Sequence, residues 1–279
     1  MSAPLRNHDQ VSDPVEIKTD VTNKKSGSFP NPLLVIAISI GVFIAAQMVA
    51  FFLLVLASYF TGSTDGAADN LLVDNTLAQF IYLLIANGLV LGIIWRLLKG
   101  RGLTLRDIGM KRPKKNVVLV AVLGLICFYL LAGLLGGIIL KLLPGIPTDQ
   151  EQNIGFDEIA GWGEIGLVFA SLVIIVPLGE EILTRGYLFS GLRARLNFGW
   201  TLLITSALFG VAHLQTASDG NLSWALVINI FFLAIVLGYL REKATIWAAI
   251  NTPILMAIQK ITNSSNQIVL KVTLFDIWQ

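Results

Sequence analysis

The sequence predicts an all-α fold, a polytopic transmembrane helical bundle of about seven spans. Of the 279 residues, 55% are hydrophobic and only 14% are charged, whereas a soluble domain carries roughly 25% charged residues. The apolar residues stand in blocks of about 18 or more, the length of a membrane span. The basic residues gather in the segments between these blocks. These three observations exclude a soluble globular domain and make the lipid bilayer the first expected partner. The net charge of +2 gives no indication of a nucleic-acid partner.

The elements follow in order along the chain. Residues 1–32 are polar and are expected to form a disordered N-terminal tail. Residues 33–98 are expected to hold two N-terminal transmembrane helices, 99–261 the remaining helices of a core, and 262–279 a C-terminal tail. The seven predicted spans cover about residues 33–60, 77–98, 117–142, 165–196, 200–214, 223–240 and 245–261.

The charges of the connecting segments predict the orientation. Segment 99–116 is rich in Lys and Arg and contains Asp107 as its one acid, whereas segments 61–75 and 143–164 contain acids and no Lys or Arg. Basic loops remain on the cytoplasmic side of a membrane. We therefore expect an integral, multi-pass membrane protein with its N-terminus on the cytoplasmic-equivalent side.

Two adjacent carboxylates, Glu180 and Glu181, precede Arg185 in the otherwise apolar stretch VPLGEEILTRGYLF. Glu181 and Arg185 stand four apart with the acid first, which is the favourable helical spacing for an ion pair. Glu180 then lies about 100° around the helix from Glu181 and can face elsewhere. A carboxylate in a dry cavity can accept a proton. The alternative is that these charges only anchor a helix end at the inner interface.

The stretch FGVAH places His213 four residues after Phe209, within the fifth predicted span. A lone histidine in an apolar helix is either a hydrogen-bonded core residue or a proton-transfer group. Asn229 and Asn251 are single amides in the sixth and seventh spans. Hydrogen bonding between helices is the plain interpretation of both amides.

In combination, EExxxR on one helix and FxxxH on the next resemble the CAAX-prenyl protease and bacteriocin-processing (CPBP, or Abi) family of intramembrane proteases. The resemblance extends from about residue 103 to 252 and includes the stretches SALFGVAHL and FFLAIVLGYLREKATIWAAI. It implies a bundle around a wet cavity, in which Glu180 is the general base and His213 its partner on a water, with Glu181 and Arg185 as a supporting ion pair. It also implies a membrane-associated peptide or protein substrate, hydrolysed by a glutamic-type endopeptidase.

The sequence departs from the family pattern on the last core helix. The family places a second His there, followed four residues later by an Asn, and both are thought to stabilise the oxyanion. Alignment of residues 245–250 on the preceding motif puts Pro253 and Ala257 at these positions, and neither side chain can donate a hydrogen bond. Asn229 is the predicted substitute donor.

Three functions therefore remain open at the level of sequence. The first is the endopeptidase, and the second is a catalytically impaired, protease-like scaffold that binds hydrophobic peptides without cutting them. The third is a transporter that uses Glu180 and Arg185 in an ion path, although inverted repeats typical of transporters are not evident. Zinc is disfavoured, because it usually takes at least three protein ligands and only His213, Glu180 and Glu181 are available. No cofactor is expected.

Overall fold

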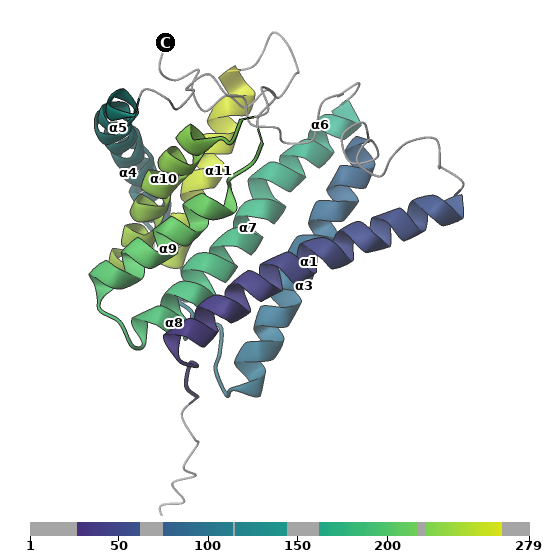
Figure 1. Ribbon diagram of the computed structural model, residues 1–279, viewed down its shortest axis with the longest axis horizontal. Helices are drawn as coiled ribbons and strands as arrows, with labels where there is room; N and C mark the ends of the chain where they lie inside the picture. The colour runs from purple at the N-terminus through teal and green to yellow at the C-terminus, as the bar shows by residue number, and fades with distance from the viewer. Residues whose placement is uncertain (1–26, 62–74, 114, 144–161, 217–220, 264–279) are drawn as a thin grey trace, which may run out of the picture.

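The computed structural model describes residues 27–61, 75–113, 115–143, 162–216 and 221–263. In these residues the chain forms seven helical rods, some interrupted by π-helical turns labelled η (Figure 1). The all-α membrane bundle is therefore confirmed. The predicted tails fall mostly outside the described residues. The rods are α1 (Pro32–Thr61), α3 (Thr76–Gly100), α4–η1–α5 (Val117–Leu131, Ala132–Gly136, Gly137–Leu142), α6–η2–α7–η3–α8 (Trp162–Phe169, Ala170–Ile175, Val176–Glu181, Ile182–Leu188, Phe189–Arg193), α9 (Phe198–Ala212), α10 (Trp224–Lys243) and α11 (Ile246–Asn263).

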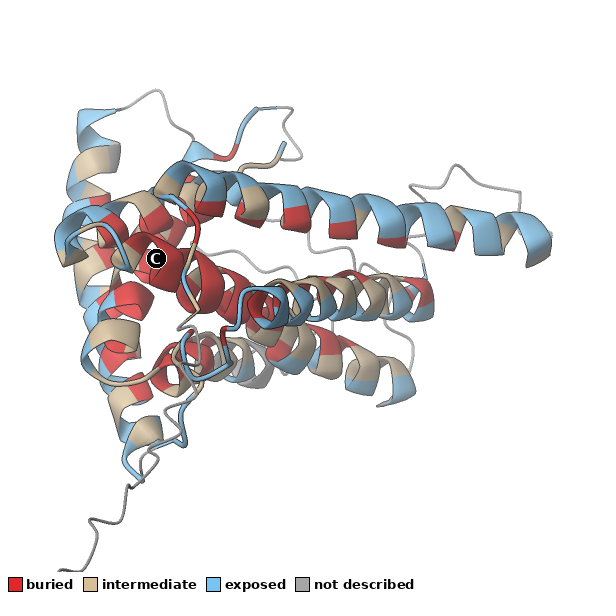
Figure 2. Ribbon diagram, turned by 90° about the horizontal axis from the view of Figure 1, so that it is seen from below, coloured by how far each residue is buried: buried red, intermediate tan, exposed pale blue. Residues whose placement is uncertain are grey.

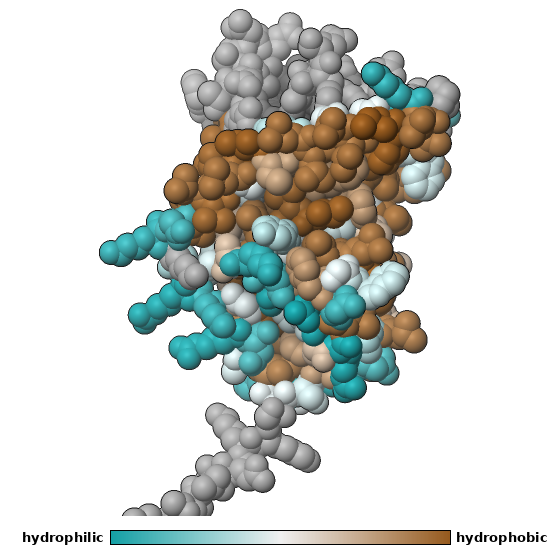
Figure 3. Space-filling model, turned by 90° about the vertical axis from the view of Figure 1, so that its left-hand side faces the viewer, coloured by the Kyte–Doolittle hydropathy of each residue, from teal (hydrophilic) through white to brown (hydrophobic). Residues whose placement is uncertain are grey.

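Five rods within the described part are long and apolar enough to cross a membrane, whereas α9 and α11 are shorter. The long rods expose large apolar side chains, such as Met48 and Phe52 of α1 and Leu130 of α4. Figure 3 shows a broad apolar band on the face that it draws, with hydrophilic side chains gathered toward one end. Such a band matches a hydrocarbon environment, in which helices satisfy their own backbone hydrogen bonds.

The core lies where the rods face one another, as the buried residues in Figure 2 show. One cluster joins α10 to α4, α9 and α11, and includes Phe232, Leu237 and Ala248. A second cluster joins α1 and α3 to the fourth rod, and includes Ile94 and Tyr187. Because α1 packs on both α3 and η3, the N-terminal helices are part of the same bundle as the remaining rods.

The fourth rod passes through Pro177 without a break. Proline lacks a backbone N–H and clashes with the carbonyl of the preceding turn, so it usually kinks a helix. Here Pro177 follows the π-helical segment η2, whose wider turn accommodates a residue that cannot close an α-helical hydrogen bond. The rod therefore continues from Trp162 to Arg193, which makes it longer than one bilayer crossing needs.

The basic segment after α3 is a loop with turns in its described residues. Gly102 and Gly109 adopt positive φ angles of 67° and 91°, a conformation that glycine adopts without strain. Leu103 and Ile108 are buried in the second cluster. The loop therefore attaches to the bundle through its apolar residues.

Candidate active site

A cavity of about 460 Å³ lies between α1, the stretch from Glu180 through η3, and the C-terminal end of α9. Most of its lining is apolar, for example Phe43 of α1 and Leu183 of η3. Its polar lining residues among those described are Ser39, Glu180, Thr184, His213 and Gln215. The cavity is thus an apolar space with a small group of polar atoms at one place, which is typical of a ligand site.

Glu180 and His213 face each other in this cavity. Glu180 Oε1 lies 3.9 Å from His213 Nε2, and the two side chains are 30% and 21% exposed. This separation is too long for a direct hydrogen bond, but a water between the two groups can contact both. His213 Nδ1 lies 2.8 Å from the carbonyl oxygen of Phe209. A carbonyl only accepts, so Nδ1 carries a proton, and in the neutral ring Nε2 presents its lone pair toward Glu180.

The lengths of two rods explain why these side chains meet. Glu180 precedes Arg193 at the end of α8 by 13 residues, and His213 follows Phe198 at the start of α9 by 15 residues. At about 1.5 Å per residue, both lie roughly 20 Å from the shared end of the two helices. The sequence predicted His213 inside the fifth helix. In the structure it instead caps the C-terminus of α9, with φ −97° and ψ 5°. The short α9 therefore ends at the depth of Glu180.

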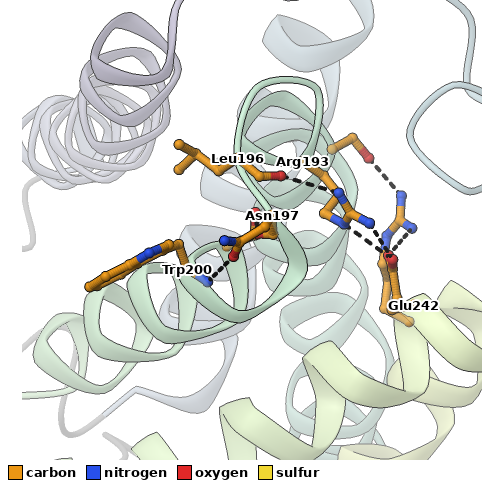
Figure 4. A network of polar contacts seen from close by, with 8 residues as sticks. Arg193, Leu196, Asn197, Trp200 and Glu242 are labelled. Atoms are coloured by element: carbon orange, nitrogen blue, oxygen red, sulfur yellow. Dashed lines mark hydrogen bonds and ion pairs between the residues drawn. The ribbon is translucent and has the colours of Figure 1, made fainter.

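The turn between α8 and α9 is held by polar contacts (Figure 4). The Asn197 side-chain oxygen accepts a hydrogen bond from the Trp200 N–H at 3.0 Å and caps α9. Arg193 Nη1 donates to the Leu196 carbonyl at 3.1 Å. Arg193 also forms an ion pair with Glu242 of α10 at 3.0 Å. Because Glu180 and His213 lie at similar distances from this turn, these contacts help to set their relative height.

Glu181 and Arg185 form a buried ion pair behind the cavity. Arg185 Nη1 lies 2.8 Å from Glu181 Oε1, and both side chains are 2% exposed. The guanidinium stands 4.0 Å above the Phe209 ring centre, and that ring lies 4.6 Å from the His213 ring centre. The pair therefore supports Phe209, and Phe209 contacts His213 through both its ring and its carbonyl oxygen.

Further residues at this site, among them Thr184 and Arg241, were not recognised as site residues in the sequence. Thr184 lines the cavity, and its hydroxyl donates to the Glu180 carbonyl at 2.6 Å while accepting from Arg185 Nη1 at 2.9 Å. Arg241 of α10 donates from Nε to the Arg185 carbonyl at 3.0 Å and from Nη2 to Ser190 at 2.7 Å. Thr184 could have been found as the residue one helical turn after Glu180. In the sequence, Arg241 is a basic residue near the end of a predicted span, which indicates membrane orientation and not a site.

Other predicted residues lie away from the cavity. Asn229 donates to the Ala225 carbonyl at 3.1 Å, and its side-chain oxygen faces Gly136 of η1. Pro253 lies inside α11, and neither it nor Ala257 belongs to the cavity lining. Asn251 donates to the Trp247 carbonyl at 2.7 Å within α11. The structure thus brings together Glu180, Glu181, Arg185, Phe209 and His213, but not Asn229.

Within the described ranges, no three His, Cys, Asp or Glu side chains come together in a group that could hold a metal ion. The absence of a metal cofactor remains a prediction from the sequence. The available polar groups are those already described, a carboxylate and an imidazole facing one cavity.

The bundle defines a class, an integral membrane protein with a helical core. Residues 162–257 match the family model described as type II CAAX prenyl endopeptidase Rce1-like. This match, which covers about a third of the chain, supports the CPBP/CAAX protease family that the two motifs predicted. No match was found among curated proteins or among solved structures. The matched segment contains Glu180 and His213, whereas α1, which lines the same cavity, lies outside it.

Proposed function

We propose that the protein is an intramembrane glutamic-type endopeptidase that hydrolyses a peptide bond in a membrane-associated substrate. The observation that carries this proposal is the 3.9 Å separation between Glu180 Oε1 and His213 Nε2 in an otherwise apolar cavity. The match of residues 162–257 to a protease family model supports the same reaction class.

The proposed reaction begins with a water between the two side chains. As the water oxygen attacks the scissile carbonyl carbon, Glu180 accepts one of its protons as general base. His213 accepts a hydrogen bond from the same water through Nε2, because its Nδ1 donates to Phe209. Collapse of the tetrahedral intermediate breaks the C–N bond, and the protonated Glu180 returns its proton to the leaving amine. The Glu180–His213 pair suffices for these reaction steps, so the proposal uses no metal or other cofactor.

The surroundings of the pair suit this role. Glu181, Arg185 and Phe209 form a packed series behind His213, which keeps the imidazole oriented. Most of the cavity wall is apolar, and electrostatic interactions are stronger beside such a wall than in bulk water. The same wall suits an apolar or lipid-modified peptide, and the family description makes a prenylated CAAX peptide the first substrate to try.

The orientation forms part of the proposal. The loop charges support an N-terminus on the cytoplasmic-equivalent side, with the basic loop after α3 on that same side. The α8–α9 turn then also lies on that side, because α1 and the fourth rod start at opposite ends of the bundle (Figure 1).

The test is cleavage by the purified full chain in lipid nanodiscs. One probe is a quenched fluorescent peptide ending in a farnesylated CAAX box, and a second is an unmodified apolar peptide. Glu180→Gln keeps the shape of the side chain but removes its basicity, and cleavage should fall by about 100-fold or more. Cleavage should fall by a similar factor in His213→Ala. The double variant should lose little more activity than either single variant, because both residues act on one water.

Glu164→Gln is the matched control, since it changes a carboxylate of the same rod that does not line the cavity. It should cleave like wild type. If cleavage persists in Glu180→Gln, Glu180 is not the base and the mechanism is wrong.

A second candidate is a protease-like scaffold that binds apolar peptides without cutting them. The observation that favours it is the presence of Pro253 and Ala257 at the positions of the family's second His and Asn. Wild type that binds the farnesylated peptide but cleaves neither probe would support the scaffold. Glu180-dependent ion flux in proteoliposomes without cleavage would instead support the transporter.

A further inference from the structure

We infer that Gln215 supplies the hydrogen bond that stabilises the oxyanion of the proposed reaction, in place of the family donors that this chain lacks. The inference rests on the proposed function and adds a catalytic residue to it. Gln215 lies two residues after His213 and lines the same cavity as Glu180 and His213.

The first observation is an unused donor. The side-chain nitrogen of Gln215 is buried, and it has no hydrogen-bond partner among the described residues. Buried polar groups in proteins are nearly always paired, and an exception in a native fold needs an explanation. Gln215 belongs to the lining of the cavity, and its side-chain nitrogen has almost no accessible surface. The side chain must therefore turn toward the cavity for a ligand there to become the acceptor.

The second observation is that the other polar residues of the cavity are already engaged. The Ser39 hydroxyl donates to the Val35 carbonyl at 2.9 Å, and the Thr184 hydroxyl donates to the Glu180 carbonyl at 2.6 Å. His213 uses its Nδ1 proton on Phe209, and an ionised Glu180 carries no proton. Of the polar side chains known to line the cavity, Gln215 therefore has the protons still available for an acceptor.

The third observation is that the backbone of Gln215 is held in place. Its N–H donates to the Ser223 hydroxyl at 3.2 Å, and the same hydroxyl donates to the Gln215 carbonyl at 2.9 Å. The Ser223 N–H donates to that carbonyl as well, at 3.0 Å. Ser223 is buried directly before α10. The backbone of Gln215 is thus tied to the start of α10, so its side chain extends from a fixed point in the cavity lining.

The chemistry fits the step that Glu180 and His213 leave uncovered. When the water attacks, the carbonyl oxygen gains negative charge, and the reaction needs a donor directed at that oxygen. The amide N–H of Gln215 donates without transferring its proton, so the charge balance of the hydrolysis is unchanged.

Gln215→Ala and Gln215→Glu test the inference in the full chain in nanodiscs with the farnesylated peptide. Removal of one oxyanion donor lowers kcat by about 100- to 1000-fold in proteases. We expect that loss for Gln215→Ala with KM nearly unchanged, and at least as large a loss for Gln215→Glu, whose anion repels the oxyanion. Gln215→Asn should recover part of the rate, since it keeps the donor on a shorter side chain. Asn251→Ala removes an amide outside the cavity and should cleave like wild type.

A phosphinic analogue of the tetrahedral intermediate provides a second readout. Its affinity should fall in Gln215→Ala by about the same factor as kcat/KM, whereas affinity for the uncleaved peptide should not change. A variant that had only lost structure would bind both ligands less well. Thermal unfolding identifies such a variant, and the nearly isosteric Gln215→Glu replaces Gln215→Ala if the latter does not fold.

The outcomes separate this inference from the proposed function. Cleavage that requires Glu180 but is unchanged in Gln215→Ala would overturn the inference alone. The inference is also wrong if Asn229→Ala loses activity and Gln215→Ala does not. Wild type that neither cleaves the peptide nor binds the phosphinic analogue would overturn both.

Discussion

Arg193 at the end of α8 donates two hydrogen bonds, from Nε at 3.1 Å and Nη2 at 3.0 Å, to one carboxylate oxygen of Glu242 near the end of α10. The two residues are 49 positions apart in the sequence, and their contact joins the α8–α9 turn to a third helix. Glu180 lies on the rod that enters this turn and His213 at the end of the helix that leaves it, so the contact holds together the end of the bundle from which both are measured.

This pair should show a measurable coupling energy. The side chains are 36% and 20% exposed, so the coupling should be about 0.5–1 kcal/mol rather than the value of a buried pair. A double-mutant cycle of Arg193→Ala and Glu242→Ala, followed by thermal unfolding in detergent, measures it. Additive effects of the two single changes would mean that the pair does not stabilise the turn.

Loss of Arg185 should destabilise the protein more strongly. Arg185→Ala leaves Glu181 as a buried carboxylate without its partner, and breaking one side of a buried ion pair costs about 3–5 kcal/mol. The expected result is a clearly lower melting temperature in detergent. The double variant Glu181→Gln/Arg185→Met should recover much of the loss, because it removes both charges. A melting temperature for Arg185→Ala equal to that of wild type would mean that the pair is solvated.

Gly179, directly before Glu180, should not tolerate alanine. A Cβ at this position would overlap the side-chain amide of Asn87 on α3 and would also approach the Asn87 Cβ at 3.1 Å. Rotation of the amide alone therefore cannot relieve the clash, and overpacking of this kind costs about 1–3 kcal/mol. We expect a lower melting temperature for Gly179→Ala and partial recovery in Gly179→Ala/Asn87→Ala.

Gly88→Ala is the matched control for this prediction. It lies on α3 beside Asn87, and a Cβ there would meet no atom within 4 Å. Alanine is the better helix former by about 1 kcal/mol, so this variant should unfold at the same temperature as wild type or higher. Equal stability of Gly179→Ala and Gly88→Ala would contradict the close α3–α7 packing.

The proposed orientation can be tested with two glycines at opposite ends of the bundle. Gly100 ends α3 beside the basic loop, Gly163 lies in the first turn of α6, and both are exposed with open space where a Cβ would stand. In a Cys127→Ser background, Gly163→Cys should react with an impermeant maleimide in intact cells. Gly100→Cys should react only after permeabilisation. Labelling of Gly100→Cys in intact cells would mean that the orientation is the opposite of the one proposed.

The helices themselves could be predicted from the sequence with little error. Each apolar block became a helical rod within a few residues of its predicted bounds, because a hydrophobic segment in lipid must satisfy its own backbone hydrogen bonds. The Glu181–Arg185 pair was equally predictable, since a spacing of four residues places two side chains on one helical face. Both results depend on local periodicity.

The arrangement of the site was decided by tertiary structure. Glu180 and His213 meet because a long fourth rod and a short α9 extend from one turn, and no local pattern records that match of lengths. The same holds for α1, which completes the cavity from outside the family-matched segment, and for Asn229, which faces η1 instead of the cavity. Local spacing determines which face of its own helix a side chain occupies. Which other helix that face meets depends on side-chain packing between segments far apart in the chain.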